Sequence, residues 1–454
     1  MISRRSVSRL CAALCAALLT AGANAQDPVR SHPHSAVLLL ADGMGWGHLQ
    51  MRLEAARRKE QPSALASLLA RGRVGACALR PADALVPESA GAASILSTGE
   101  SMPNRALSQD AEGRRPAGLL ERARAAGLAT GLVSMGRLTH AVPAAFLTHA
   151  AKRDPEPPLA EAVADSGVQV LLGGGSEAFS GALLERVRGK GTRVLQESSE
   201  LSAVRPGERV LGLFTPDYFP YSIDKAQGAP SLAEMTSSAL TSLSSNATGF
   251  LLVVDARLID ESSHNNDASA MLAEMAEFDL ALARLMDFAQ KRKDMLLVLV
   301  SPHDTGSPAF VSAANPLDWT GPEHLDRVLA QKGSFRSMLS ALWEQESQGR
   351  VVDAETVRKA LRERFAAGVE LKAEDYGRIA AAFKQGPKRE AFEHAPACAA
   401  LSRALEPFYR VRWLTGTHSD LPVPLLSWGP GAEAFEGWFS AEEVSRSLAR
   451  ALRI

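Results

Sequence analysis

The sequence predicts an α/β fold: a doubly wound, mostly parallel central sheet with helices on both faces, plus a helical insertion. Short runs rich in valine and leucine recur along the chain, and amphipathic helical stretches separate them. This alternation of strand-like and helix-like segments is typical of a doubly wound sheet. From about residue 307 to residue 407 the strand pattern stops and helical segments take over, which predicts the insertion.

Seven apolar runs are the candidate strands. They do not alternate between apolar and polar residues, which favours parallel strands buried on both faces. The runs are Ala36–Ala41, Ala129–Ser134, Val168–Leu172, Val210–Phe214, Phe250–Val254, Met295–Val300 and Val423–Trp428. The candidate helices include Ser231–Leu243 and Ala268–Lys291, and, within the insertion, Ser334–Gln348, Asp353–Ala367 and Ala373–Lys384.

The first 25 residues have the features of a signal peptide. A basic start is followed by an apolar segment over 10–19, and Ala23-Asn24-Ala25 forms a cleavage site with small residues. We therefore expect cleavage after Ala25, a periplasmic or secreted protein, and one domain over 26–454. No later segment is long and apolar enough to predict a membrane anchor.

Charge and cysteine content limit the partners. The formal net charge of −1 becomes −4 when the three arginines of the signal peptide are removed, so binding to nucleic acid is not indicated. Cys77 and Cys398 are the cysteines of the expected mature chain. In an exported protein they could form a disulfide, and two separate buried thiols are the alternative.

Acids and one histidine follow three of the candidate strands. Asp42 comes after the first run, Asp255 after Val254, and His303 with Asp304 after Val300. In doubly wound folds the chemistry takes place at the carboxyl ends of the strands. These side chains could bind a metal there, although an aspartate in such a turn could equally cap a helix.

Three further residues have the chemistry of zinc ligands. Asp260 and His264 are four residues apart, which on a helix puts both on one face. A carboxylate oxygen and an imidazole nitrogen can share one zinc ion. His418 lies in a loop before the last candidate strand.

Ser89 is the candidate nucleophile. It stands in Pro-Glu-Ser-Ala-Gly-Ala-Ala-Ser over residues 87–94, where small residues let a ligand approach the backbone closely. A helix beginning here would direct its N-terminal dipole at an anion such as phosphate. Close helix packing is the structural alternative for this segment.

Taken together, these motifs resemble the alkaline phosphatase family over about residues 35–306 and 411–452. Asp42-Gly43-Met44-Gly45 resembles the first metal motif and Glu88-Ser89-Ala90-Gly91-Ala92 the nucleophile motif. The other matching segments are 138–153, which ends at Arg153, 171–175, 255–264 and 423–432.

The resemblance implies hydrolysis of small phosphate monoesters through a phosphoserine on Ser89, with Arg153 holding the phosphoryl oxygens. It implies two Zn²⁺ ions. One would be held by Asp260, His264 and His418, and the second by Asp42 with His303 and Asp304. A third family site, usually for Mg²⁺, would involve Asp255.

Four positions depart from the family pattern. Glu88 replaces an aspartate, and His303-Asp304 reverses the expected order, so either the two ligands have exchanged places or His303 alone remains one. Val142 stands where the third site uses a hydroxyl or an acid, and Asp255 where a longer glutamate is usual. We expect the third site to be weak, empty or differently filled, with His140 as a further candidate ligand.

Three alternatives remain. The chain could be a phosphodiesterase of the same superfamily, or a non-catalytic or weakly active protein that keeps the fold and binds phosphate or metal. A sulfatase is disfavoured, because Ser89-Ala90-Gly91 lacks the proline and arginine of that family's motif. The candidate partners are the small phosphate monoester that serves as substrate and, in a homodimer, a second copy of the chain.

Overall fold

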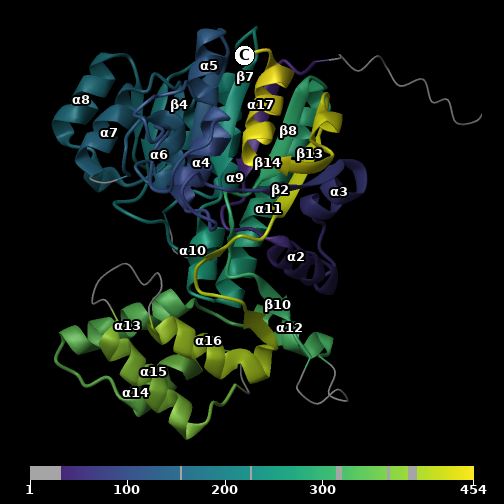
Figure 1. Cartoon of the computed structure of the whole chain (residues 1–454). Helices are drawn as coiled ribbons and strands as arrows, with labels where there is room; N and C mark the ends of the chain where they lie inside the picture. The colour runs from purple at the N-terminus through teal and green to yellow at the C-terminus, as the bar shows by residue number, and fades with distance from the viewer. Residues whose placement is uncertain (1–31, 154–155, 225–227, 313–319, 366–368, 387–395) are drawn as a thin grey trace, which may run out of the picture.

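A computed structural model describes residues 32–153, 156–224, 228–312, 320–365, 369–386 and 396–454 (Figure 1). Its centre is a ten-stranded sheet with the order β14-β2-β13-β8-β1-β7-β3-β4-β6-β5. The strands are β1 (Ser35–Leu40), β2 (Arg73–Ala78), β3 (Ala129–Arg137), β4 (Val170–Gly174), β5 (Arg193–Leu195), β6 (Val210–Leu213), β7 (Phe250–Asp255), β8 (Met295–Val300), β13 (Val423–Trp428) and β14 (Gly437–Ser440).

All strand pairs of this sheet are parallel except those of β13, which runs antiparallel to both β8 and β2. The predicted mostly parallel sheet is therefore confirmed, and each of the seven predicted runs contains or overlaps a strand. The direction of β13 differs from what its sequence suggested. A strand buried on both faces is apolar throughout, whichever way it runs, so this pattern does not reveal direction.

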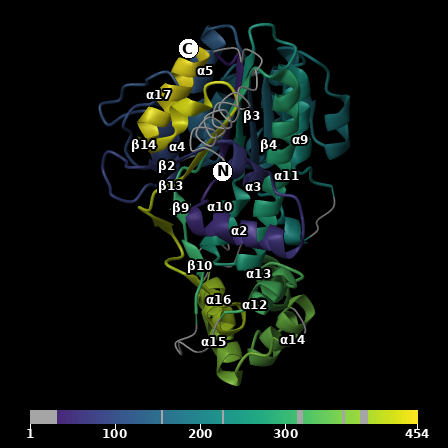
Figure 2. The ribbon, with the colours of Figure 1, turned by 90° about the vertical axis from the view of Figure 1, so that its right-hand side faces the viewer.

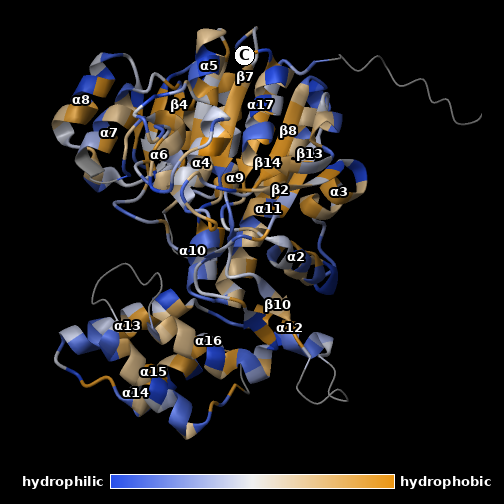
Figure 3. Cartoon of the chain, viewed as in Figure 1, coloured by the Kyte–Doolittle hydropathy of each residue, from blue (hydrophilic) through white to orange (hydrophobic). Residues whose placement is uncertain are grey.

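Helices cover both faces of the sheet, which Figures 1 and 2 show from two sides. One layer contains α4 (Ser89–Thr98), α5 (Leu119–Ala125) and α17 (Ala441–Leu452), and the other contains α9 (Leu232–Leu243) and α11 (Ala268–Arg292). Side chains of β1 alternate between two apolar cores: Val37 and Leu39 face one, and Leu38 and Leu40 the other. This is the two-residue period of a strand. In Figure 3 the strands accordingly form an apolar band at the centre.

The helices outside the insertion surround this sheet. They are α2 (Trp46–Arg58), α3 (Ala64–Arg71), α4 (Ser89–Thr98), α5 (Leu119–Ala125), α6 (Ala141–Leu147), α7 (Glu156–Asp165), α8 (Gly181–Gly189), α9 (Leu232–Leu243), α10 (Leu258–His264), α11 (Ala268–Arg292) and α17 (Ala441–Leu452).

A group of helices follows the carboxyl end of β8. It comprises α12 (Pro322–Leu329), α13 (Phe335–Ser347), α14 (Ala354–Arg364), α15 (Ala373–Gln385) and α16 (Pro396–Tyr409). The antiparallel strands β10 (Pro308–Phe310) and β11 (Val411–Trp413) join it to the sheet region. In Figure 1 these helices lie below the sheet, on the side of α10. Arg336 of α13 donates to Glu261 of α10 over 2.7 Å. That residues 307–407 are an inserted unit stays a prediction.

Three features bear on the other expectations. Residues 1–25, the predicted signal peptide, lie outside the described residues. Among the helices that are described, none is long and apolar enough to cross a membrane. Cys77 and Cys398 are both buried, in different apolar cores, and no disulfide joins them.

Candidate active site

The register of the central strands aligns the ends of β8, β1 and β7. Leu40 of β1 pairs with Val300 of β8 on one side and with Asp255 of β7 on the other. The residues that follow these strands therefore meet at one edge of the sheet. Asp42 and His303, which follow β1 and β8, are both fully buried there.

A glycine turn lets α10 approach the end of β1. Gly43 has a φ of +80°, a left-handed conformation that glycine adopts without strain. A Cβ atom on Gly43 would lie 2.6 Å from Asp260 Cα. Because glycine has no side chain, α10 comes close enough to bring Asp260 beside Asp42.

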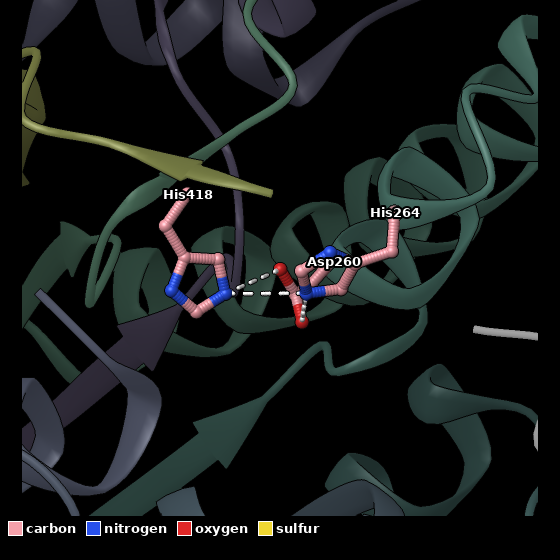
Figure 4. A group of neighbouring side chains, drawn as sticks. All are labelled: Asp260, His264 and His418. Carbon is pink, nitrogen blue, oxygen red and sulfur yellow. Dashed lines mark hydrogen bonds and ion pairs between the residues drawn. The ribbon is translucent and has the colours of Figure 1, made fainter. Parts of the chain in front are cut away.

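Asp260, His264 and His418 form the first group of candidate ligands (Figure 4). His264 Nε2 lies 3.4 Å from Asp260 Oδ2 and 3.2 Å from His418 Nε2. His418 Nε2 is 3.8 Å from Asp260 Oδ1. Three donor atoms within 4.8 Å of one another are close enough to share one metal ion.

The outer ring nitrogens fix these histidines. His264 Nδ1 donates to the Gly416 carbonyl over 3.0 Å, and His418 Nδ1 donates to the Pro87 carbonyl over 2.8 Å. Both Nε2 atoms are then available to face the group, which is how proteins orient metal-binding imidazoles. Burial lowers the pKa of His418 and favours the neutral ring that binds metals.

Asp42, Asp260 and His303 form the second group. His303 Nε2 lies 3.4 Å from Asp42 Oδ1, and its Nδ1 lies 3.8 Å from Asp260 Oδ1. Burial acts to raise the pKa of Asp260, but the charges of His264 and Arg257 outweigh it and hold that pKa well below its ordinary value. Asp260 is therefore an anion between the two groups.

Ser89 lies beside the second group. It is the first residue of α4 and is 4% exposed, and its Oγ is 3.0 Å from His303 Nε2. Glu88 precedes it and caps α4, since its Oε2 accepts from Ala90 N over 2.9 Å. The Arg153 guanidinium donates to Glu88 Oε1. The structure thus brings Ser89 and Arg153 to the same end of α4.

Two predicted ligands lie outside both groups. Asp304 accepts hydrogen bonds from Ser419 over 2.6 Å and from Ser307. Asp255 accepts from Ser134 over 2.7 Å. Within the described residues, neither carboxylate belongs to a group of candidate metal ligands.

Sequence reasoning missed three supporting residues. Thr305 donates to Asp260 and lies 3.1 Å from His303 Nδ1. The second supporting residue is His48, whose Nε2 lies 2.9 Å from Ser263 Oγ on α10. The third is Arg257, which donates to Asp260. Only contacts made in the folded chain identify them, because nothing in the local sequence distinguishes them from ordinary polar residues.

A cavity of about 1090 Å³ lies elsewhere in the molecule. Its lining includes Arg73, Lys293 and Trp428, which lie near the start of β8, at the opposite end of that strand from His303. None of the candidate ligands lines it. The chemistry of the gathered side chains, rather than the size of a cavity, therefore identifies the candidate active site.

Known proteins resemble the chain over nearly its whole length. A family model described as alkaline phosphatase matches residues 34–454. Alkaline phosphatase 3 of Bacillus subtilis is 27% identical over 94% of this chain and 90% of its own. Alkaline phosphatase 4 of the same species is 26% identical over 96% of this chain and 92% of its own.

Solved structures share the fold. The alkaline phosphatase of Thermus thermophilus has a TM-score of 0.83 and 29% identity, and the match covers 95% of each chain. The cold-active enzyme of Shewanella sp. has a TM-score of 0.78 and 25% identity, covering 92% of this chain and 99% of its own. Sequence, fold and the gathered side chains agree: this chain belongs to the alkaline phosphatase family and is a hydrolase of phosphate monoesters.

Proposed function

We propose that the chain is a zinc-dependent phosphatase that acts through a phosphoserine on Ser89. The observation that carries this proposal is the position of Ser89 Oγ, 3.0 Å from His303 Nε2 and thus beside the second group of candidate ligands. A serine hydroxyl is a weak nucleophile unless a neighbouring base or metal activates it.

The donor atoms fit zinc. Asp260, His264 and His418 would hold one ion, and Asp42 and His303 the other. Imidazole nitrogen and carboxylate oxygen are common zinc ligands. The 3.2 Å contact between His264 Nε2 and His418 Nε2 supports this, because two inward-facing nitrogens suit a shared cation. When bound, zinc would lower the pKa of a coordinated oxygen and neutralise charge on the phosphoryl group.

Of the pair His303-Asp304, we propose that only His303 is a ligand. Its Nε2 faces Asp42 within the second group of candidate ligands, whereas Asp304 belongs to neither group found among the described residues and accepts from the hydroxyls of Ser307 and Ser419. Asp304 would then orient the short antiparallel pair of β9 (Asp304–Thr305) with β12 (His418–Ser419), in which Thr305 pairs with His418.

The reaction needs two displacements at phosphorus. Ser89 Oγ gives up its proton to water and forms a bond to phosphorus while the bond from phosphorus to the leaving alkoxide breaks, and the alkoxide takes a proton from water. Water then attacks the phosphoserine, which releases phosphate and restores the hydroxyl. Arg153 would bind the phosphoryl oxygens with its planar fork of N–H donors, and Glu88 would hold that guanidinium in place.

Ser89→Ala tests the nucleophile. We expect kcat for p-nitrophenyl phosphate to fall at least about 10³-fold while the zinc content is unchanged. Ser97→Ala on the same helix is the control, because the buried Ser97 Oγ has no hydrogen-bond partner among the described residues. Undiminished turnover by Ser89→Ala would show that Ser89 is not the nucleophile. Activity in protein that contains no zinc would show that the reaction does not depend on zinc. A preference for bis(p-nitrophenyl) phosphate would favour the diesterase alternative.

We also infer export, which rests on the sequence of residues 1–25. N-terminal sequencing of the protein isolated from its own cells should find Gln26 as the first residue. A mature protein that keeps residues 1–25 would contradict this inference.

A further inference from the structure

A buried arginine lies among the acids of the site. Arg257 immediately precedes α10 and is 3% exposed, and its Nη1 donates to Asp260. Burying a guanidinium costs free energy unless carboxylates or other acceptors surround it. The position of this cation, beside a residue shared by both ligand groups, calls for a reason beyond general stability.

The stem of Arg257 packs at the carboxyl end of β3. A Cβ atom on Gly136 would lie 3.1 Å from Arg257 Cγ and 3.3 Å from Ser134 Oγ. The Gly136 N–H donates to Ser134 Oγ over 2.9 Å, and Ser134 Oγ donates to Asp255 over 2.7 Å. Arg257 is therefore fixed between Asp260 and the Ser134–Asp255 pair.

Electrostatics agrees with this geometry. Burial raises the pKa of Asp255 to about 7, and the positive charge of Arg257 opposes that shift. Burial lowers the pKa of His140, and Arg257 adds to that lowering. The charge of Arg257 thus favours the ionised form of Asp255 and the neutral form of His140, the two residues considered for the third site.

These residues do not fit a Mg²⁺ ion. Mg²⁺ requires near-octahedral oxygen ligands and binds through carboxylates and water. Here Asp255 Oδ2 already accepts from Ser134, so only Asp255 Oδ1 is without a hydrogen-bond partner among the described residues, and His140 offers nitrogen rather than oxygen. A fixed guanidinium beside them repels a second cation.

We propose that Arg257 supplies, as part of the chain, the positive charge that a third divalent cation would supply, so that the protein binds no Mg²⁺ here. The inference rests on the proposed function, because it assumes that the carboxylates of the site serve metal-assisted phosphate chemistry. Arg257 acts through Asp260 and Asp255, and is a positioning residue rather than a group that touches substrate.

Zinc-loaded full-length protein tests the inference directly. It is dialysed against millimolar MgCl₂, and bound Mg²⁺ and Tm are measured. We expect no stoichiometric Mg²⁺ and no change in Tm. One Mg²⁺ per chain in the wild type, lost in Asp255→Asn, would overturn the inference. The zinc content of the same samples separates this result from a failure of the proposed function, which would appear as wild-type protein without zinc.

Two variants extend the test. Arg257→Ser removes the charge, so its Tm should fall and then rise when Mg²⁺ is added, whereas Arg257→Lys keeps a charge and should stay insensitive to Mg²⁺. Arg52→Ser is the matched control, since Arg52 is a buried arginine paired with Asp279 over 2.8 Å. It should lose stability without any response to Mg²⁺. If Arg257→Ser has the wild-type Tm and zinc content, the charge is not needed and the inference is wrong.

Discussion

At the residue scale, Glu88 shows how one side chain can serve both structure and substrate binding. Its Oε2 caps α4 by accepting from Ala90 N over 2.9 Å, and it also accepts from Arg105 N over 2.9 Å. Its Oε1 accepts from Arg153. The family resemblance led us to expect an aspartate at this position, and the longer side chain of Glu88 still reaches the arginine.

Glu88→Gln separates these two tasks. The amide oxygen can still cap α4, but the lost charge no longer holds Arg153 in place. A charge-assisted hydrogen bond is worth about 1.5–3 kcal/mol, so we expect the inhibition constant for inorganic phosphate to rise about tenfold or more. Tm should change little. Glu54→Gln is the control, because Glu54 forms an exposed pair with Arg57. A lower Tm with unchanged phosphate inhibition would show that Glu88 serves only as a cap.

The residues of the candidate site were predictable where their position in the sequence distinguishes them. Asp42, His303 and Asp255 follow apolar runs, and Asp260 and His264 have helical spacing. The structure places Asp42, Asp260 and His303 in one group. Whether Asp304 would face the same group as His303 was left open by the sequence, because adjacent residues after a strand point in different directions that only the surrounding contacts decide.

At the element scale, the turn after β1 determines how closely α10 can approach. Gly43 and Gly127 have nearly the same left-handed φ, +80° and +83°. A Cβ on Gly43 would meet Asp260 Cα at 2.6 Å, whereas a Cβ on Gly127 would meet nothing within 4 Å. Replacing either glycine would therefore strain the backbone to a similar extent, but only a side chain at Gly43 would collide with α10.

Gly43→Ala and Gly127→Ala measure that difference. Left-handed backbone costs a non-glycine residue about 1–2 kcal/mol, so both variants should lose roughly that much stability. Only Gly43→Ala should also displace α10, lower the zinc content and reduce kcat. Thermal unfolding, metal analysis and turnover of the two proteins compare them directly. Equal zinc content and equal activity would show that the Gly43 turn does not position the ligands.

Long buried elements were predictable and short exposed ones were not. The runs that became β1, β7 and β8 are apolar throughout, and their burial matches that pattern. β5 has three residues, and β14 is exposed or half-buried along its length, so neither has a recognisable apolar run. β2 contains Gly75 and small residues, and pairing with β13 and β14 makes it a strand.

At the scale of the whole molecule, the site exists only in the complete fold. Its candidate ligands come from distant parts of the chain, from Asp42 to His418. A ligand that binds only the folded chain stabilises that chain by mass action. Folding, metal binding and catalysis are therefore linked, and buried charges far from the site also affect activity through stability.

Glu274 is such a charge. It lies on α11 at 4% exposure and accepts from Ser222 N over 2.7 Å. Burial raises the pKa of this carboxyl to about 8, from an ordinary value of 4.5. Because the folded chain holds the proton more tightly, Glu274 stabilises the fold below pH 4.5, and this contribution is lost as the pH rises to about 8.

Glu274→Gln should remove this part of the pH dependence. Across the window from 4.5 to about 8 the wild type should lose about 1.4 kcal/mol per pH unit from this group, whereas a glutamine stays neutral. The variant should therefore gain stability relative to the wild type as the pH rises. Unfolding followed in urea at several pH values measures the difference.

Glu185→Gln, at an exposed ion pair with Arg188, controls for the substitution itself. A constant difference between Glu274→Gln and the wild type from acid to alkaline pH would mean that Glu274 ionises alike in the folded and unfolded chains.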